Sequence, residues 1–401
     1  MKNTVLIFEQ KVKVPPDAVY YAFTNRTAIR EWLCDGVESD PREGGRLYFW
    51  WNTGFTMSGT FTKLEENHVV ECTWNGSTDP GPTAVSVALA PEGDGTLVTL
   101  THGGLGSGKA WEAAPEEITK RWNEALENLA SVLETGVDLR IARRPTLGVF
   151  SGELISEEDA EKRGLPRGAN GFIPDNVQPG TGTEAAGIRA GDVIHSIDQV
   201  VLNSGSVLRR ALMGKRVGDV VEVVYWHDGK QIKTHMTLSA RPMPQVPGSP
   251  KELAKALQTD ADQMGAELAK ILDGVSEEKA SHRPAEGEWS AKEVMAHLIL
   301  SERTWMMFVN PLANGTEPRD FPVDNLQAHI DALLATYPTL DALRAELRRI
   351  RAELIALVAN LPEAFAKRKG SYLRMGEILL QTYLHTRAHY EQMRKAIESA
   401  G

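Results

Sequence analysis

The spacing of hydrophobic residues changes once along this chain, at a proline-rich segment over residues 239–248. Before that segment, apolar residues mostly alternate with polar ones, as they do in half-buried β-strands. After it, they recur every three or four positions, as they do on amphipathic helices. Repeated proline favours an extended connection, and 401 residues are many for one domain. We therefore expect a multidomain protein.

Three folded regions and one linker follow from this pattern. The first is an α+β domain in which turn-punctuated strands are followed by a long helix, and the second is again strand-rich, with one short helix. The last is helical throughout and predicts a four-helix bundle with one extra element, because Ser249-Pro250 and the capping box Ser290–Glu293 are typical helix starts. The expected regions are residues 1–138, 143–240, 241–249 (the linker) and 250–401.

Net charge, cysteine content and the lack of long apolar stretches indicate which partners and which cellular location to expect. The formal net charge is −10, which argues against general nucleic-acid binding, since phosphate contacts need a Lys/Arg surface. Two cysteines, Cys34 and Cys72, are too few for a disulfide framework. The N-terminal apolar run is too short for a signal peptide, and no stretch is long enough to span a membrane. We expect a cytoplasmic protein with no membrane partner.

The first region resembles the START-like (SRPBCC) superfamily, in the branch related to the activator of the heat-shock-protein-ninety ATPase. The resemblance rests on residues 14–24, on Ile29-Arg30-Glu31-Trp32, on His102 and on residues 121–126. It implies a helix-grip fold with an apolar ligand cavity between helix and sheet. The tryptophans that would line this cavity are also explained as ordinary core, and His102 as a structural histidine rather than an acid or base. The cavity candidates are Trp32, Trp50, Trp74 and Trp122.

The second region resembles PDZ domains of the type attached to HtrA-like proteases. The resemblance rests on residues 187–198, Gly-Ile-Arg-Ala-Gly-Asp-Val-Ile-His-Ser-Ile-Asp, and on the turn at residues 228–230. Gln199 departs from the pattern, because a glycine commonly follows the Ile-Asp pair. No Gly-x-Ser-x-Gly nucleophile elbow accompanies it. The resemblance implies binding of protein C-termini as an added β-strand beside residues 147–150; a groove filled by the chain itself is the alternative. The groove candidates are Leu147, Gly148, Val149, Leu208 and Leu212, with Arg143 and Arg144 nearby.

His385 and His389 are four positions apart on an expected helix, so their imidazoles lie on one face about one turn from each other. With ten histidines in the chain, such a pair arises by chance in about one chain in four, so the spacing alone is weak. His297 lies mid-helix among apolar residues, which places it near the core. Buried imidazoles need partners, and a metal ion is one such partner; three separately satisfied histidines are the alternative.

The helical region resembles the DinB-like superfamily, which shares its bundle with thiol-dependent S-transferases and maleylpyruvate isomerases. The resemblance rests on Trp289–Val294 leading into His297, and on His385-x-x-x-His389-x-x-Gln392. It implies a divalent metal, Zn or Ni most simply, held by His297, His385 and His389. Three protein ligands leave a position open for water or a thiol, as in catalytic zinc sites. Glu302 and Tyr383 are weaker candidates for supporting groups.

Two functions are consistent with the sequence. The first is a metal-dependent transferase or hydrolase that uses a small thiol or water, with a peptide-binding PDZ module and an apolar cavity. The second is a non-enzymatic adaptor or sensor that binds protein C-termini and a hydrophobic ligand. Apart from the metal site, the sequence offers no clear acid, base or nucleophile, so it does not choose between them.

Overall fold

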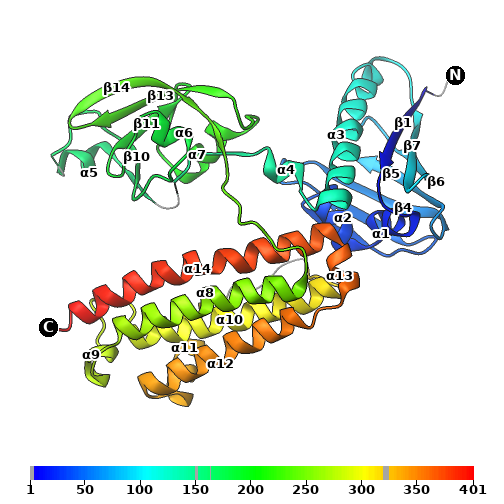
Figure 1. Cartoon of the computed structure of the whole chain (residues 1–401). Helices are drawn as coiled ribbons and strands as arrows, with labels where there is room; N and C mark the ends of the chain where they lie inside the picture. Colours follow the sequence, from blue (N-terminus) through cyan, green and yellow to red (C-terminus); the bar gives the residue numbers. More distant parts are fainter. Residues whose placement is uncertain (1–3, 150–151, 163, 319–324) are drawn as a thin grey trace. The chain divides into compact units, whose positions relative to one another are not determined.

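The computed structural model describes residues 4–149, 152–162, 164–318 and 325–401, and it divides them into two compact units. The larger unit combines Met1–Asp138 with Pro244–Gly401, and the smaller is Leu139–Met243. The expected multidomain architecture is confirmed (Figure 1): an α+β helix-grip domain, a β-rich PDZ region and a helical bundle. The first domain and the bundle thus share one compact unit, and the exact domain boundaries stay a prediction.

The first domain is an antiparallel sheet of seven strands in the order β1-β7-β6-β5-β4-β3-β2. The long helix α3 (Ala114–Thr135) packs on it with Ile118, Trp122, Leu126 and Leu129 buried, the stripe expected from the sequence. Helices α1 and α2 are separated at Asn25, whose side chain caps the N-terminus of α2, and strand β2 follows them. The other elements are α1 (Pro16–Thr24), α2 (Arg26–Trp32), β1 (Thr4–Val12), β2 (Gly36–Ser39), β3 (Arg46–Trp50), β4 (Thr56–Glu65), β5 (Val69–Gly76), β6 (Thr83–Glu92) and β7 (Gly95–Leu105).

The smaller unit is a β-rich fold whose main sheet runs β14-β13-β11-β10-β9, with β12 paired to β11. The β11–β12 turn contains Asp198 at φ 43° and Gln199 at φ 67°, so the chain takes the left-handed conformation there without the usual glycine. Its strands are β8 (Pro145–Thr146), β9 (Gly152–Ile155), β10 (Gly171–Pro174), β11 (Val193–Ile197), β12 (Val200–Val201), β13 (Val220–His227), β14 (Lys230–Thr237) and β15 (Ser239–Ala240), and its helices are α4 (Leu139–Ala142), α5 (Glu157–Lys162), α6 (Gly182–Ala185) and α7 (Gly205–Leu212).

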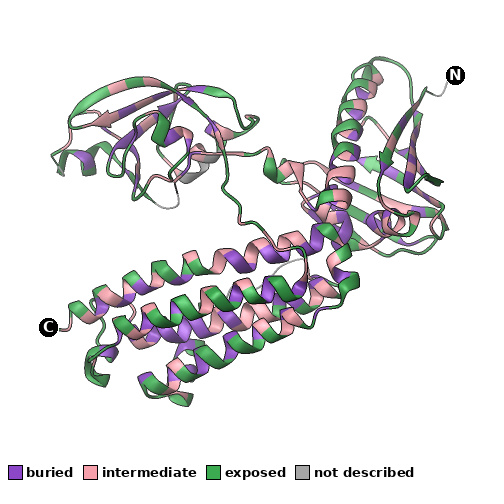
Figure 2. Cartoon of the chain, viewed as in Figure 1, coloured by how far each residue is buried: buried purple, intermediate pink, exposed green. Residues whose placement is uncertain are grey.

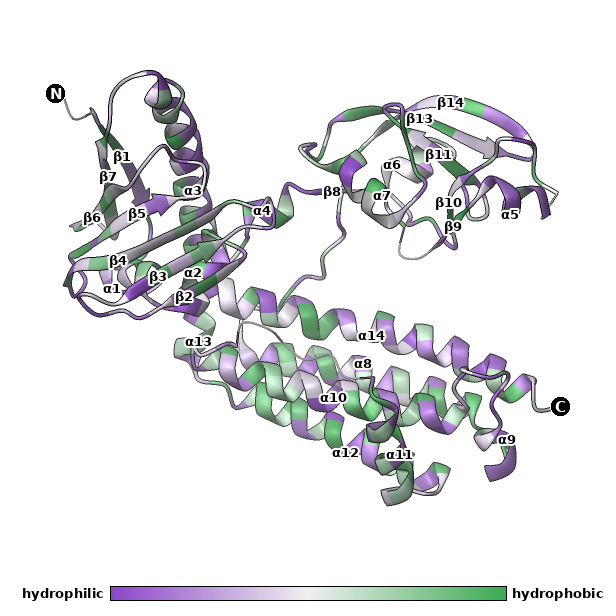
Figure 3. Cartoon of the chain, turned by 180° about the vertical axis from the view of Figure 1, so that it is seen from behind, coloured by the Kyte–Doolittle hydropathy of each residue, from purple (hydrophilic) through white to green (hydrophobic). Residues whose placement is uncertain are grey.

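In the described residues of the bundle, four long helices and three short ones are present. Ser249 and Ser290 accept hydrogen bonds from Glu252 N and Glu293 N, and the second is a full capping box, as expected. Figure 2 shows buried residues on the inner sides of these helices and exposed ones on the outer sides, and Figure 3 shows the matching division by hydropathy. The helices are α8 (Pro250–Ile271), α9 (Glu277–Ser281), α10 (Ala291–Ala313), α11 (Gln327–Thr336), α12 (Leu340–Ala359), α13 (Glu363–Lys367) and α14 (Lys369–Glu398).

The bundle core has two apolar layers. One contains Val294, Leu343 and Met393 near one end of the helices, and the other contains Leu253, Phe308 and Met375 near the opposite end. Among the described residues, none of the helices combines the length and the apolar character needed to cross a lipid bilayer. The apolar spacing predicts a last helix over roughly residues 375–399, and in the structure this helix begins at Lys369, six residues earlier.

Contacts with the first domain explain that early start. A Cβ placed on Gly136, where α3 ends, would lie 2.5 Å from the carbonyl oxygen of Lys369, so the two backbones meet without a side chain between them. Ser371 donates a hydrogen bond to Glu31 of α2, and Arg374 lies 3.7 Å from the same carboxylate. Burial raises the pKa of Glu31 to about 7 despite the opposing attraction of Arg374.

The buried Glu31 makes the stability of the larger unit depend on pH. Its carboxyl is easier to protonate in the folded state, at a pKa of about 7, than at its ordinary value of 4.5. Its stabilising contribution is therefore complete below pH 4.5 and is lost as the pH rises through 7, by up to about 3 kcal/mol. The charged groups facing it are Arg374, Glu317 and Arg368. We expect urea unfolding to show a smaller loss of stability between pH 4.5 and 8 in Glu31→Gln than in wild type; parallel losses would contradict this.

Candidate functional site

The structure brings the three predicted metal-binding histidines together from two helices. His297 lies on α10, and His385 and His389 lie one turn apart on α14. The Nε2 atom of His385 is 3.3 Å from Nε2 of His297 and 3.1 Å from Nε2 of His389. One ring nitrogen of each residue lies within 4.8 Å of the other two. This is the convergence that a shared ligand requires, across 88 residues of sequence.

Burial and crowding keep these imidazoles neutral. The pKa of His297 is lowered to about 4, first by burial and then by His389 and His385. Burial, followed by His389, lowers the pKa of His385 to about 4, and burial also lowers the pKa of His389. Neutral imidazole is the form that binds metals, so the lone pairs are available at neutral pH.

The groups around the triad fit a metal centre. His389 Nδ1 donates to Oε1 of Gln392 at 2.9 Å, which leaves Nε2 as the free ligand atom; this is the usual support for a metal-binding histidine. The Trp289 ring covers His297 at a centroid distance of 5.0 Å. His297 is 6% exposed while His385 reaches solvent, so a small molecule has access from one side. Three imidazoles would hold the ion and leave room for another ligand.

Ser301 is a neighbour of the triad that the sequence analysis missed. Its Oγ lies 3.5 Å from His297 Nε2 and donates to the His297 carbonyl oxygen at 3.0 Å. The sequence feature that could have identified Ser301 is its position one helical turn after His297.

Among the described residues, the two weaker candidates for supporting groups do not contact the triad histidines by hydrogen bonds: Glu302 bonds Arg351 at 2.7 Å, and the side chain of Tyr383 is exposed.

Four of the five predicted peptide-binding residues belong to one apolar cluster of the PDZ region. Leu147 is buried in the core of this unit, and Val149, Leu208 and Leu212 pack against that core. Gly148 has φ 71°, and a Cβ there would collide with Thr181 at 2.4 Å, so glycine is required. Strand β9 forms an edge of the sheet, which makes it the place for an added strand. Residues 147–149 are not in a strand and Phe150 lies outside the described residues, so an added strand beside residues 147–150 stays a prediction, with β9 the next strand along the chain.

The tryptophans of the first domain pack closely rather than around an open ligand cavity. Trp32, Trp74 and Trp122 line a cavity of about 30 Å³, enough for about one water molecule. Trp50 does not line it and lies over Gly36. His102 receives a hydrogen bond from Trp122 Nε1 on Nδ1 (2.9 Å), and its Nε2 lies 2.8 Å from Thr83 Oγ1. Burial lowers the pKa of His102 to about 4. Both of its ring nitrogens are thus used within the core.

Comparison with known families supports the three modules. Residues 13–134 match the family described as activator of Hsp90 ATPase homolog 1-like protein, residues 155–238 match the PDZ domain, and residues 260–393 match the DinB superfamily. The chain therefore contains an AHSA1-type domain, a PDZ domain and a DinB-like domain. Each match covers less than half of the chain.

Individual relatives match only parts of the chain. The serine protease Do-like HtrA of Lactococcus lactis subsp. cremoris (strain MG1363) is 34% identical over 115 residues, 28% of this chain and 28% of that protein. The periplasmic serine endoprotease DegP of Escherichia coli (strain K12) is 33% identical over 125 residues, 31% of this chain and 25% of that protein. The chain spans about a quarter of the length of these curated relatives. The solution structure of the Aha1 dimer from Colwellia psychrerythraea is 23% identical, covering 33% of this chain and 96% of that one, with a TM-score of 0.29.

The hydrogen bond from His389 to Gln392 gives a test of the metal centre. In Gln392→Leu, the imidazole loses the acceptor that orients it, so we expect divalent-metal affinity to fall about 10–100-fold. Competition of the purified protein against a chromogenic chelator measures this affinity. Gln263→Leu, which alters a glutamine on α8 that bonds Glu267, is the matched control and should bind metal like wild type. Equal affinities for all three proteins would contradict the assigned role.

Proposed function

We propose that this protein is a metal-dependent transferase or hydrolase whose reaction centre is the triad His297, His385 and His389. The observation that carries the proposal is the convergence of three Nε2 atoms where the bundle is open to solvent. The Nε2 atom of His385 lies 3.3 Å from that of His297 and 3.1 Å from that of His389. In the described part of the chain, three histidines form this group with no fourth His, Cys, Asp or Glu beside them, a donor set typical of catalytic rather than structural zinc sites. Zinc or nickel suits this donor set.

Each residue around the triad has a separate role in the proposed reaction. A bound divalent ion would lower the pKa of a coordinated thiol or water and so supply a nucleophile at neutral pH. Gln392 fixes the ring of His389, and Trp289 shields the buried side of His297 from water. The Ser301 hydroxyl lies beside His297 Nε2, and because it donates its hydrogen to the His297 carbonyl, its oxygen is placed to accept a hydrogen bond from a substrate atom. The co-substrate that this arrangement favours is a small thiol or water.

Metal content tests the proposal directly. We expect wild-type protein to hold one equivalent of a divalent metal after dialysis, and His385→Ala to hold almost none, because two imidazoles bind far more weakly than three. His282→Ala is the matched control, since His282 is an exposed residue at the end of α9 and should leave metal content unchanged. Inductively coupled plasma mass spectrometry gives the stoichiometry. A wild-type protein that takes up no stoichiometric metal would end the proposal.

The same proteins distinguish an enzyme from a structural metal site. In cobalt-loaded wild type, a small thiol that occupies the open position should change the visible absorption spectrum, whereas His385→Ala should show no such change. A metal-loaded wild type with an unchanging spectrum, and no turnover with any thiol or water-dependent substrate, would favour a structural centre instead.

The second candidate is a non-enzymatic adaptor that binds protein C-termini through its PDZ domain. The edge position of β9 in the sheet favours this activity, because an extended peptide can hydrogen-bond to an edge strand. An apolar last side chain would contact Leu208 and Leu212. A hydrophobic ligand in the first domain would require its cavity of about 30 Å³ to open. Both this role and the expected cytoplasmic location remain proposals.

Peptide binding is tested by a matched pair of substitutions on α7. Leu208→Ala removes part of the apolar pocket, so we expect about tenfold weaker binding of C-terminal peptides, equivalent to the loss of one or two buried methylene groups. Met213→Ala, at a residue 70% exposed just beyond the helix, should bind like wild type. An array of C-terminal peptides selects the probe, and fluorescence anisotropy measures affinity. No binding by wild type to any peptide of the array would argue against a recruiting PDZ domain.

A further inference from the structure

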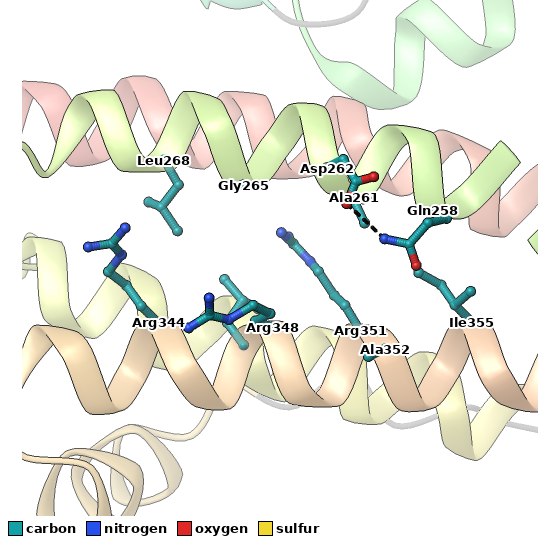
Figure 4. Close-up of a pocket in the computed structure, with 11 residues that line it drawn as sticks. Gln258, Ala261, Asp262, Gly265, Leu268, Arg344, Arg348, Arg351, Ala352 and Ile355 are labelled. Carbon is teal, nitrogen blue, oxygen red and sulfur yellow. Dashed lines mark hydrogen bonds between the residues drawn. The ribbon is translucent and has the colours of Figure 1, made fainter. Parts of the chain in front are cut away.

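A hollow of the helical bundle lies between α8 and α12, and three arginines line it. Its volume is about 350 Å³, within the size range of small-molecule sites. Figure 4 shows the side chains of Arg344, Arg348 and Arg351 extending from α12 toward α8, where Ala261 and Gly265 face them. These arginines occupy positions i, i+4 and i+7, so they form one stripe on the helix. None of the triad histidines lines this hollow.

The hollow has room because α8 places two small residues, Ala261 and Gly265, opposite the arginine stripe. A Cβ added to Gly265 would meet no atom within 4 Å, which means that the space beside it is open. The arginines descend in exposure from Arg348, which is exposed, through Arg344, which is half-buried, to Arg351, which is 7% exposed. A ligand could therefore enter at the surface and reach a buried guanidinium at the floor.

Arg351 supplies the observation that points to a ligand. Its Nε donates to Glu302 Oε1 at 2.7 Å, while its Nη2 is buried and has no hydrogen-bond partner in the described part of the chain. An unsatisfied buried donor of this kind is costly, so this nitrogen would gain free energy by donating to an acceptor oxygen of a ligand. Burial lowers the pKa of Arg351, but the Glu302 carboxylate and the Tyr390 hydroxyl together outweigh burial and raise the pKa, so the guanidinium stays charged.

The other side chains determine the net charge of the hollow. Glu302 neutralises Arg351, so the attraction for an anion comes mainly from Arg344 and Arg348, with Arg351 acting as a directed donor. Arg344 has only a 3.7 Å pairing with the exposed Asp341, and Arg348 forms no ion pair or hydrogen bond with the described residues. Asp262, the one acidic residue of the lining, accepts from Gln258 at 2.8 Å.

We propose that the hollow between α8 and α12 binds a small phosphorylated metabolite through the phosphoryl oxygens of that metabolite. Guanidinium groups bind phosphate by paired, charge-assisted hydrogen bonds, and three of them along one stripe suit a group with several acceptor oxygens and more than one negative charge. A single carboxylate would engage fewer of them. This inference stands apart from the metal centre, because it uses different residues and does not need a metal.

Inorganic pyrophosphate is the first probe, titrated calorimetrically into the full-length protein at constant ionic strength. We expect saturable binding at one site in wild type. Arg348→Ala should weaken it about tenfold or more, whereas Arg349→Ala should not, although both remove one positive charge from adjacent positions. Arg349 pairs with Glu346 and Glu353 and does not line the hollow. Equal weakening by both variants would reveal a general charge effect and overturn the proposal.

A variant that fills the hollow while keeping the fold separates loss of the site from loss of folding. Gly265→Leu replaces a helical glycine with a better helix former and places a side chain in the open space, so it should fold at least as stably yet lose pyrophosphate binding. Unchanged binding in this variant would overturn the assigned site, as would an absence of saturable binding in wild type. Tighter binding of citrate than of pyrophosphate would overturn the phosphoryl assignment. Metal content, measured on the same samples, should be equal in all of them, which separates this test from that of the triad.

Discussion

The larger unit depends on the packing of one long helix, α14, against α10 and against the first domain. Its 30 residues span about 45 Å as a continuous helix. Its first turns lie against α2 and α3, where Gly370 leaves room for Glu31 and Val132, and its later turns carry His385 and His389. Because a helix is stiff, the distance and angle between these two ends are fixed. His385 and His389, two of the predicted metal ligands, are therefore held by a rigid element, as the proposed reaction centre would require.

Buried polar groups show which parts of the molecule are structural and which are open to a ligand. His102 has both ring nitrogens engaged by Trp122 and Thr83, so the core of the first domain satisfies it completely. The triad differs, because its Nε2 atoms face mainly one another. Arg351 is intermediate, with one nitrogen bonded to Glu302 and another without a partner in the described residues. Burying a polar group without a partner costs free energy, so these two places are where an added ligand would stabilise the fold most.

The Arg351–Glu302 pair also has a place in the architecture of the bundle. It lies between the two apolar layers of the core, one around Val294 and the other around Phe308. A buried ion pair of this kind contributes little net stability, but breaking it by removing one partner is strongly destabilising. The triad lies on α10 and α14, whereas the arginine-lined hollow lies between α8 and α12, so the two sites use different helices of the bundle. The PDZ domain adds a third surface, whose edge strand β9 is suited to recruit a peptide.

Local patterns in the sequence determined much of this protein. The capping serines, the helical stripe of α3, the PDZ motif at 187–198 and the one-turn spacing of His385 and His389 each involve residues close together in the chain, where backbone geometry alone relates their side chains. Tertiary packing decided the rest: that His297 meets the pair, that β9 is the edge strand, that the tryptophans leave a cavity of only about 30 Å³, and that Gly265 faces Arg351 across an open groove. Periodicity tells which face of a helix is buried, but not which other helix covers it. That choice depends on the combined fit of many side chains distant in sequence, and so only the folded structure contains it.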